Sequence, residues 1–334
     1  MRVVAGIDAG ATRTRAVLVS EEGVFIGRGM ADRACYGADS MGAIKNSLKQ
    51  ALAGAMDNAI LQVTTIDSIF VGIAGVVTEQ DQGAVAKLVR DFPFVNKECV
   101  SIDHDIRIAH AGGLAGDEGI VVIAGTGSSC YGRDKTGMKW QAGGWQFLLD
   151  DIGSAYWISI EGMKAMVQAY DGRGRKTSLS AMLCDTLDLT TVPDIIRRLH
   201  VDGLFRSKCS MSKAEIASVA PAVLEEAACG DEVAHQIVVR GVKGLVDMVR
   251  AVAENLEIRR DDLLVTSAGG LLSGSDLMYK EFCKALSRVL PGAKLVKPRL
   301  EPVFGASLLA LDMIGVSPDE KIVKSLTELL VENQ

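Results

Sequence analysis

A chain of 334 residues is too long for a single hydrophobic core of ordinary size, so the sequence predicts two domains. Hydrophobic residues make up 48% and charged residues 23%, and the net charge of −6, with dispersed lysines and arginines, argues against nucleic acid or a membrane as the main partner. No apolar run approaches the length of a membrane span and no leader precedes the first expected strand, which predicts a cytoplasmic protein. The seven cysteines are widely spaced without a CxxC pair, so we expect free thiols.

The first part of the chain predicts an α/β domain over residues 1–117. Apolar runs and turn residues predict strands at residues 3–8, 14–20, 24–28, 66–73 and 99–102. Apolar residues at helical spacing predict helices at residues 40–59 and 81–91 and from about 105 onward. The alternation of the two element types is typical of a sheet covered by helices.

The pattern then restarts, which predicts a second α/β domain over residues 118–312. Strands at 119–124 and 129–133 repeat the order of strand, glycine turn and strand, and they indicate a weak internal duplication. Residues 154–257 are expected to form a helical insertion, followed by a strand at 263–266, a helix at 276–290 and a strand at 293–297. Gly305 is expected to permit close helix packing near the end of this domain. Residues 313–334 carry Ile322, Leu326, Leu329 and Leu330 at helical spacing, which predicts a terminal helix docked on the body.

Two glycine turns follow apolar strands, and each is suited to binding phosphate. The first turn, residues 6–14, reads Gly-Ile-Asp-Ala-Gly-Ala-Thr-Arg-Thr, and the second turn, residues 123–129, reads Ile-Ala-Gly-Thr-Gly-Ser-Ser. Small residues let backbone N–H groups face an anion, and hydroxyl groups add further donors. Neither turn has the Gly-Lys-Ser/Thr of a P-loop, so a nucleotide held between two domains is predicted. Alone, the first turn would be read as an ordinary glycine hairpin.

The second turn and the residues after it carry a family resemblance. Gly-Thr-Gly-Ser-Ser-Cys at 125–130 is followed by Gly-Gly-Trp at 143–145 and by Asp-Ile-Gly-Ser-Ala-Tyr-Trp at 151–157. In this order the motifs resemble the BadF/BadG/BcrA/BcrD-type ATPases of the actin, hexokinase and Hsp70 superfamily, and within them the N-acetylglucosamine kinases. The likeness extends from residue 6 to about residue 310. It implies an α/β fold of two ribonuclease-H-like domains with a central cleft, and phosphoryl transfer from ATP to a sugar; a homodimer is consistent with it.

The resemblance assigns the ATP-binding residues. Asp8 would hold Mg²⁺ through water, and the phosphates would be bound by Gly10, Ala11, Thr12 and Arg13 of the first turn and Gly125, Thr126, Gly127 and Ser128 of the second turn. The adenosine motif of the family matches Ala268, Gly269 and Gly270. From the residues alone, the alternatives are an ordinary glycine hairpin whose Asp8 bonds backbone N–H groups and, for the third motif, a turn that begins a helix.

The catalytic base is expected to be a carboxylate at the end of a strand. Residues 100–105 read Val-Ser-Ile-Asp-His-Asp, and Asp105 falls where the family places its catalytic aspartate, with Asp103 as the second choice. Phosphoryl transfer requires such a group to orient and deprotonate the attacking hydroxyl. The alternative reading is that one of the two carboxylates caps the helix that begins here. His104 and His110 are read as residues flanking a helix, without a catalytic role.

The acceptor sugar is expected to contact the acceptor segment, residues 143–151. The resemblance assigns Gly143, Gly144, Trp145 and Asp151 to the sugar; the alternatives are that Asp151 caps the next helix and that Trp145 belongs to the core. The family pattern is broken by Gln146 and Phe147, which replace small or polar residues, and by the absence of an asparagine in residues 32–37. The acceptor is therefore left open among N-acetylglucosamine, glucosamine and other sugars.

Two other classes of function are alternatives to the kinase. An ATPase activator of a radical acyl-CoA dehydratase would need cysteines that hold an iron–sulfur cluster, and the cysteine spacing here does not show that pattern. A non-catalytic sugar sensor would keep the fold without transferring phosphate. ADP release on adding an amino sugar separates the kinase from the sensor.

Overall fold

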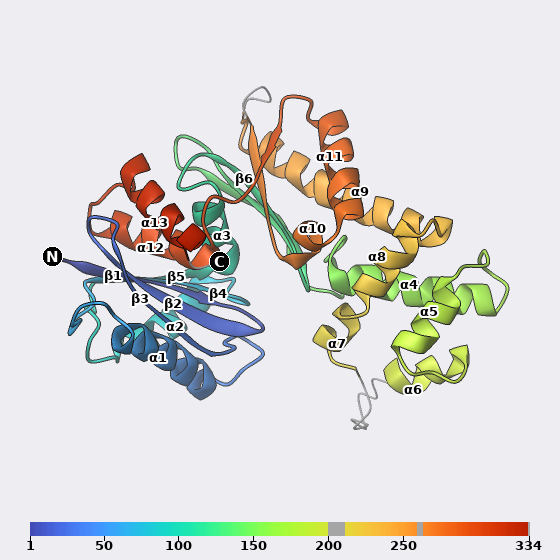
Figure 1. Ribbon diagram of the computed structural model, residues 1–334, viewed down its shortest axis with the longest axis horizontal. Helices are drawn as coiled ribbons and strands as arrows, with labels where there is room; N and C mark the ends of the chain where they lie inside the picture. Colours follow the sequence, from blue (N-terminus) through green and yellow to red (C-terminus); the bar gives the residue numbers. More distant parts are fainter. Residues whose placement is uncertain (200–210, 259–262, 333–334) are drawn as a thin grey trace. The chain divides into compact units, whose positions relative to one another are not determined.

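The computed structural model describes residues 1–199, 211–258 and 263–332 (Figure 1). The chain forms two compact units, the first made of Met1–Gly119 and Lys297–Gln334 and the second of Ile120–Val296. The predicted boundaries instead placed residues 297–312 in the second domain. Helix α12 (Pro302–Met313) accounts for the difference, because it packs on strand β1 (Val3–Ala9): a Cβ atom at Gly6 would lie 2.4 Å from the carbonyl oxygen of Val303.

The first unit is built on a five-stranded sheet of order β3-β2-β1-β4-β5. Its other strands are β2 (Arg13–Ser20), β3 (Phe25–Asp32), β4 (Ser68–Ile73) and β5 (Val100–His104). Strand β1 is antiparallel to β2 and parallel to β4, which is in turn parallel to β5. The carboxyl ends of β1, β4 and β5 therefore meet at one edge, where Asp8 lies opposite Gly72 and Gly72 opposite Asp103.

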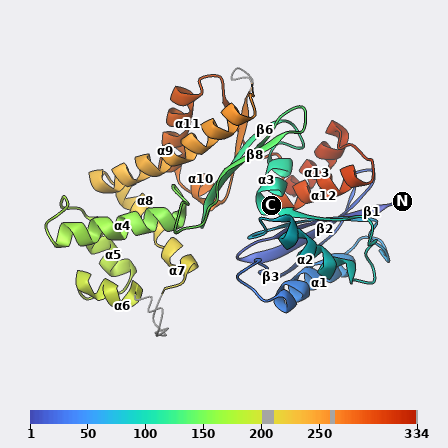
Figure 2. The ribbon, with the colours of Figure 1, turned by 180° about the vertical axis from the view of Figure 1, so that it is seen from behind.

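Helices cover both faces of this sheet, as Figures 1 and 2 show from opposite sides. Helices α1 (Met41–Asp57) and α2 (Glu79–Arg90) lie on one face, and α3 (Asp105–Gly113), α12 and α13 (Glu320–Glu332) lie on the other. A Cβ atom at Gly305 would lie 2.1 Å from the carbonyl oxygen of Ile108, so this glycine does allow α12 to approach α3. Ile322 and Leu326 of α13 are buried, as their helical spacing predicted.

The second unit repeats the sheet. Its strands are β6 (Gly119–Ala124), β7 (Ser128–Arg133), β8 (Lys139–Gly143), β9 (Leu264–Ala268) and β10 (Lys294–Val296), in the order β10-β9-β6-β7-β8. Counted from β1 and from β6, the two sheets have the same strand order, which supports the predicted duplication. Strand β8, antiparallel to β7, was not predicted because its first three residues are exposed and give no buried alternation.

Helices form most of the rest of the second unit. They are α4 (Ala155–Tyr170), α5 (Leu179–Thr186), the short η1 (Val192–Asp194), α6 (Ile195–Leu199), α7 (Lys213–Ala217), α8 (Ala220–Ala228), α9 (Glu232–Asn255), α10 (Gly270–Gly274) and α11 (Asp276–Val289). Among the helices that the structure describes, none has the length and apolar character of a membrane span. The six cysteines that the structure describes form no disulfide bonds, and Cys209 lies outside the described residues.

Candidate active site

Asp8 lies near the carboxyl end of β1 with its side chain only 14% exposed. Its Oδ2 accepts a hydrogen bond from Nη2 of Arg15 at 2.8 Å, and Nη1 of Arg15 donates to Glu301 at 3.1 Å. The carboxylate is therefore paired with a guanidinium on the neighbouring strand. The alternative reading, in which Asp8 bonds backbone N–H groups of the turn, is not what these contacts show.

Asp105, another residue predicted for the site, influences the pKa of Asp8. Burial raises the pKa of Asp8; Arg15 lowers it, Asp105 and Glu301 raise it, and the net result is a pKa above its ordinary value. Asp8 and Asp105 thus repel one another when both are ionised. A cation between or beside them would relieve that repulsion.

The donor set fits a hydrated magnesium ion. Among the described residues, no three His, Cys, Asp or Glu side chains lie close enough together to hold a metal ion by themselves. Mg²⁺ commonly binds one or two carboxylates and completes its octahedron with water and substrate phosphates. Asp8 supplies such a carboxylate.

The first turn exposes the predicted phosphate-binding residues. The N–H of Gly10 donates to the carbonyl oxygen of Arg13 at 3.1 Å, which closes the turn. Ala11, Thr12 and Arg13 are exposed at its tip. Thr14 is buried instead, and its hydroxyl donates to the carbonyl oxygen of Asp32 at 2.7 Å. The turn is thus fixed at its base and open to solvent at the residues expected to meet phosphate.

The two candidate bases have different partners. Asp103 accepts from Nη1 of Arg107 at 2.6 Å and from the N–H of His104 at 2.8 Å. Asp105 lies at the first position of α3, with its Oδ1 2.8 Å from Nδ1 of His104. Neither carboxylate caps the helix, because the cap is His104, whose Nδ1 accepts from the N–H of Ile106 at 3.2 Å. The reading of either aspartate as a cap is wrong.

His104 was given no role from the sequence, yet it contacts the expected base. Burial by itself lowers the pKa of His104, but its hydrogen bond and attraction to Asp105, together with the charge of Asp103, raise it above the ordinary value of 6.5. Its Nδ1 accepts from Ile106 only when unprotonated and donates to Asp105 only when protonated. The only sequence signal of this contact is that the two residues are adjacent where a helix begins.

The second turn is braced from several directions. The N–H of Gly125 donates to the carbonyl oxygen of Gly127 at 3.0 Å, and its own carbonyl oxygen accepts from Ala155, at the start of α4, at 2.8 Å. Ser128 donates its N–H to Oδ1 of Asp151 at 3.1 Å and its hydroxyl to the carbonyl oxygen of Ile152 at 2.9 Å. These bonds use donors of Gly125 and Ser128 that the family resemblance assigns to phosphate.

The predicted adenosine motif lies beside the second turn. Strands β6 and β9 are parallel neighbours with Ile123 opposite Ala268, so their carboxyl ends are adjacent. Gly269 has a φ of +88°, and a Cβ atom there would lie 2.5 Å from the carbonyl oxygen of Ala124. Only glycine suits this position. Gly270 follows as the first residue of α10.

The acceptor segment has an unusual backbone. Left-handed φ angles occur at Gly143 (+76°) and Gly144 (+78°) and also at two residues that are not glycine, Gln146 (+70°) and Asp151 (+66°). A residue other than glycine in this conformation costs about 1–3 kcal/mol of stability and is kept where the surrounding structure requires it. Trp145 is 68% exposed, so its reading as a core residue is wrong.

Asp151 is the most enclosed of the predicted acceptor residues. Its side chain is 4% exposed, and its Oδ2 accepts from Nζ of Lys213 at 2.9 Å. The hydroxyl of Ser154 caps α4 by accepting from the N–H of Trp157 at 3.1 Å, so the reading of Asp151 as the cap is wrong. Sequence reasoning missed Lys213 altogether.

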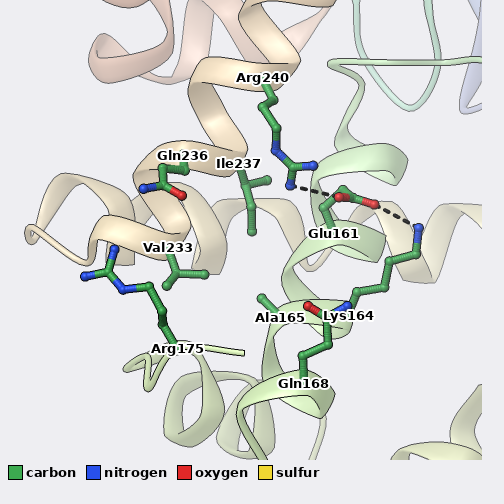
Figure 3. A pocket seen from close by; sticks show the side chains of 9 residues that line it. All are labelled: Glu161, Lys164, Ala165, Gln168, Arg175, Val233, Gln236, Ile237 and Arg240. Atoms are coloured by element: carbon green, nitrogen blue, oxygen red, sulfur yellow. Dashed lines mark hydrogen bonds and ion pairs between the residues drawn. The ribbon is translucent and has the colours of Figure 1, made fainter. Parts of the chain in front are cut away.

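A groove between α4 and α9 is a separate feature of the second unit. It encloses about 300 Å³, and Figure 3 shows the side chains that line it. Its cations are already paired: Arg240 and Lys164 both bond Glu161, and Arg175 pairs with Glu232. None of the predicted site residues lines it. The groove therefore does not compete with the turns as the candidate site.

Comparisons with known proteins agree with the resemblance. A profile of the BadF/BadG/BcrA/BcrD ATPase family matches residues 5–310. The N-acetylmuramic acid/N-acetylglucosamine kinase of Clostridium acetobutylicum is 29% identical over 310 residues, which cover 93% of this chain and 98% of that protein. The N-acetyl-D-glucosamine kinase of Dictyostelium discoideum is 27% identical over 318 residues, which cover 92% and 97%.

A solved structure shows the fold. The protein of Chromobacterium violaceum provisionally named N-acetylglucosamine kinase superposes with a TM-score of 0.75 at 21% identity, and the match covers 93% of this chain and 99% of that one. Together with the two five-stranded sheets of equal order, this likeness confirms the predicted fold class, α/β with two ribonuclease-H-like domains.

Proposed function

The chain belongs to the BadF/BadG/BcrA/BcrD ATPase family, and we propose that it is an ATP-dependent sugar kinase acting on an amino sugar such as N-acetylglucosamine or glucosamine. The kinases named above are similar over more than nine tenths of the chain. The observation in the structure that best supports the proposal is the largely buried Asp8 with Asp105 close by, at the edge of the sheet where the first turn begins. A cytoplasmic location, where ATP is available, and a homodimeric state belong to the same proposal.

ATP is bound, on this proposal, by segments of both units. The exposed tip of the first turn, with Gly10 at its base, meets the phosphates, and Asp8 holds Mg²⁺ through water. In the second turn, Thr126 is the exposed residue, so its hydroxyl and the backbone at Thr126 and Gly127 contribute most of the donors. Ala268, Gly269 and Gly270 accommodate adenosine, because the absence of side chains leaves room against the backbone.

The reaction needs a base close to the attacking hydroxyl. Asp105 is preferred to Asp103, because the family resemblance places the catalytic aspartate at Asp105 and because Asp103 is held by the guanidinium of Arg107 and by a backbone N–H, whereas Asp105 contacts His104. The sugar oxygen forms a bond to the γ-phosphorus, the bond from that phosphorus to the β,γ-bridging oxygen breaks, and the hydroxyl proton passes to the carboxylate of Asp105. ADP leaves with the electron pair of the broken bond, and Mg²⁺, when bound, neutralises developing charge on the phosphates.

The acceptor is proposed to lie against the acceptor segment. Gly143 and Gly144 let the backbone approach a sugar, and the exposed ring of Trp145 offers an apolar wall. Asp151 stands at the inner end of the segment, where it accepts from Ser128 and Lys213. Its remaining lone pairs are those that a sugar hydroxyl would use.

A coupled assay of ADP release tests the function. The purified protein is supplied with Mg²⁺ and ATP and with a panel of N-acetylglucosamine, glucosamine, N-acetylmuramic acid, glucose and mannose. We expect one or more amino sugars to stimulate ADP release, with a matching phosphosugar detected by mass spectrometry. Calorimetric binding of a sugar without any stimulation would instead identify a sensor and overturn the kinase proposal.

A further inference from the structure

Lys213 meets the buried carboxylate of Asp151 although 62 positions separate the two in the chain. We propose that Lys213 is a positioning residue for the second turn, which holds the Asp151 carboxylate against the backbone N–H of Ser128. The proposal rests on the proposed function, because it takes the second turn to bind ATP. Lys213 itself contacts no substrate in this scheme.

The carboxylate of Asp151 depends on a cation. With its side chain 4% exposed, it has little water to stabilise its charge. It has two donors: the N–H of Ser128 lies 3.1 Å from Oδ1, and Nζ of Lys213 lies 2.9 Å from Oδ2. A buried carboxylate without a charge partner either takes up a proton or moves toward water. Lys213 is the cation that pairs with Asp151 among the described residues.

The ammonium group of Lys213 is itself held in place. It lies 5.4 Å from the ring centroid of Phe147 and 6.0 Å from that of Tyr156. The two rings contact each other with centroids 5.0 Å apart, and ring faces attract cations. Lys213 also opens α7, which packs on α4, the helix whose first residue bonds the second turn. Phe147, which departs from the family pattern, therefore has a structural use.

The consequence for the second turn follows from these contacts. Without the ammonium of Lys213, Asp151 is an unpaired buried charge. Whether its carboxylate takes up a proton or moves toward water, the hydrogen bond that it accepts from the N–H of Ser128 becomes weaker. The backbone of the second turn then loses one of the bonds that fix its direction. Phosphate donors in the same turn are placed less accurately, and Asp151 is also less well placed for a sugar hydroxyl, while Gly143, Gly144 and Trp145 are unaffected.

The first test measures the turn without any ligand. Amide hydrogen exchange is followed at Ser128 in the wild type, in Lys213→Met and in Lys213→Arg, with Lys284→Met as control, since Lys284 forms an exposed ion pair in the same unit. We expect exchange about tenfold faster in Lys213→Met, because a hydrogen bond to a charged group is lost. Lys213→Arg and the control should exchange as the wild type does. Unchanged exchange in Lys213→Met overturns the proposal.

The second test uses steady-state kinetics with the best acceptor found. We expect Lys213→Met to raise KM for ATP about tenfold, and to raise KM for the acceptor as well because Asp151 also faces the sugar, with Lys213→Arg restoring most of both losses. A rise confined to KM for the acceptor would place Lys213 in sugar binding and overturn the proposal. If no sugar stimulates ADP release, the proposed function fails, and the exchange test still decides whether Lys213 braces the turn.

A double variant covers the case in which Lys213→Met does not fold. In Asp151→Asn/Lys213→Met the amide oxygen still accepts from Ser128, and no buried charge is left unpaired. We expect exchange at Ser128 in this variant to stay within about threefold of the wild type, because a neutral acceptor replaces a charged one. If the amide of Ser128 in this variant exchanged tenfold or more faster than in the wild type, pairing of the Asp151 charge would not be what the second turn requires, and the proposal would be overturned.

Discussion

Replacing Asp8 with asparagine is expected to stabilise the ligand-free protein. The side chain is 14% exposed, and burial is the largest cause of its raised pKa, with the charges of Asp105 and Glu301 acting in the same direction and only Arg15 opposing them. The fold therefore favours the neutral carboxyl group. Asparagine is neutral at every pH and keeps the shape of the side chain.

The sign of the pH dependence follows from that raised pKa. The stability contributed by neutral Asp8 is fully present below the ordinary pKa of 3.8 and is lost as the pH rises through the raised value in the folded protein. At neutral pH the wild type thus carries a cost that Asp8→Asn lacks. Relieving such a cost at a functional site commonly gains about 0.5–2 kcal/mol. For a unit of this size each kcal/mol corresponds to a rise in Tm of about 2–4 °C.

Thermal melts in EDTA test this expectation, with the exposed Asp32→Asn in the same unit as control. The gain in Tm of Asp8→Asn should shrink as the pH falls toward the raised pKa, and Asp32→Asn should show no such gain. A lower Tm of Asp8→Asn at neutral pH would refute the reasoning, since the pair with Arg15 would then outweigh burial. If Asp8 holds hydrated Mg²⁺, adding Mg²⁺ and ATP should raise the Tm of the wild type more than that of Asp8→Asn.

Three further outcomes are expected. Asp105→Asn should lower kcat roughly 10²–10⁴-fold and leave calorimetric affinity for ATP unchanged, because a general base acts on the hydroxyl alone; near-normal kcat would contradict the assignment. The raised pKa of His104 means that its stabilising contribution is complete below the ordinary value of 6.5 and is lost as the pH rises through the folded value. The wild type should therefore exceed His104→Gln in Tm most at acidic pH, and a pH-independent difference would disprove this. Gly305→Ala should destabilise by about 1–3 kcal/mol in urea titrations, since its Cβ would lie 2.1 Å from the carbonyl oxygen of Ile108, whereas Gly83→Ala, with open space around it, should not; equal midpoints would count against the close packing.

The sequence predicted best what is encoded locally. The helix expected at residues 40–59 is observed at Met41–Asp57, and the strand expected at 119–124 has those bounds. Both depend on apolar spacing within one short stretch, where few other arrangements compete. Gly269 is also marked locally, because its left-handed φ of +88° and its close approach to the carbonyl oxygen of Ala124 require glycine.

Contacts between distant segments were not predictable in this way. Nothing near Asp151 points to Lys213, and nothing in the last helices shows that α12 packs on the first sheet. The cap of α3 was missed for a chemical reason, since aspartate is a much commoner cap than histidine and two aspartates flank His104. The fold class and the two glycine turns were therefore available from the sequence, whereas the partners that orient them required coordinates.

Phe147 links the acceptor segment to the second turn. Its ring lies 5.4 Å from the ammonium of Lys213, which pairs with Asp151, so a change at Phe147 reaches the second turn as well as the acceptor segment. We expect Phe147→Leu to raise KM for ATP about twofold to fivefold, as the loss of a partly exposed cation–π contact implies. Trp145→Leu, which alters an exposed ring in the same segment, should change only KM for the acceptor. Equal effects of the two variants on KM for ATP would show that the ring of Phe147 does not act through Lys213.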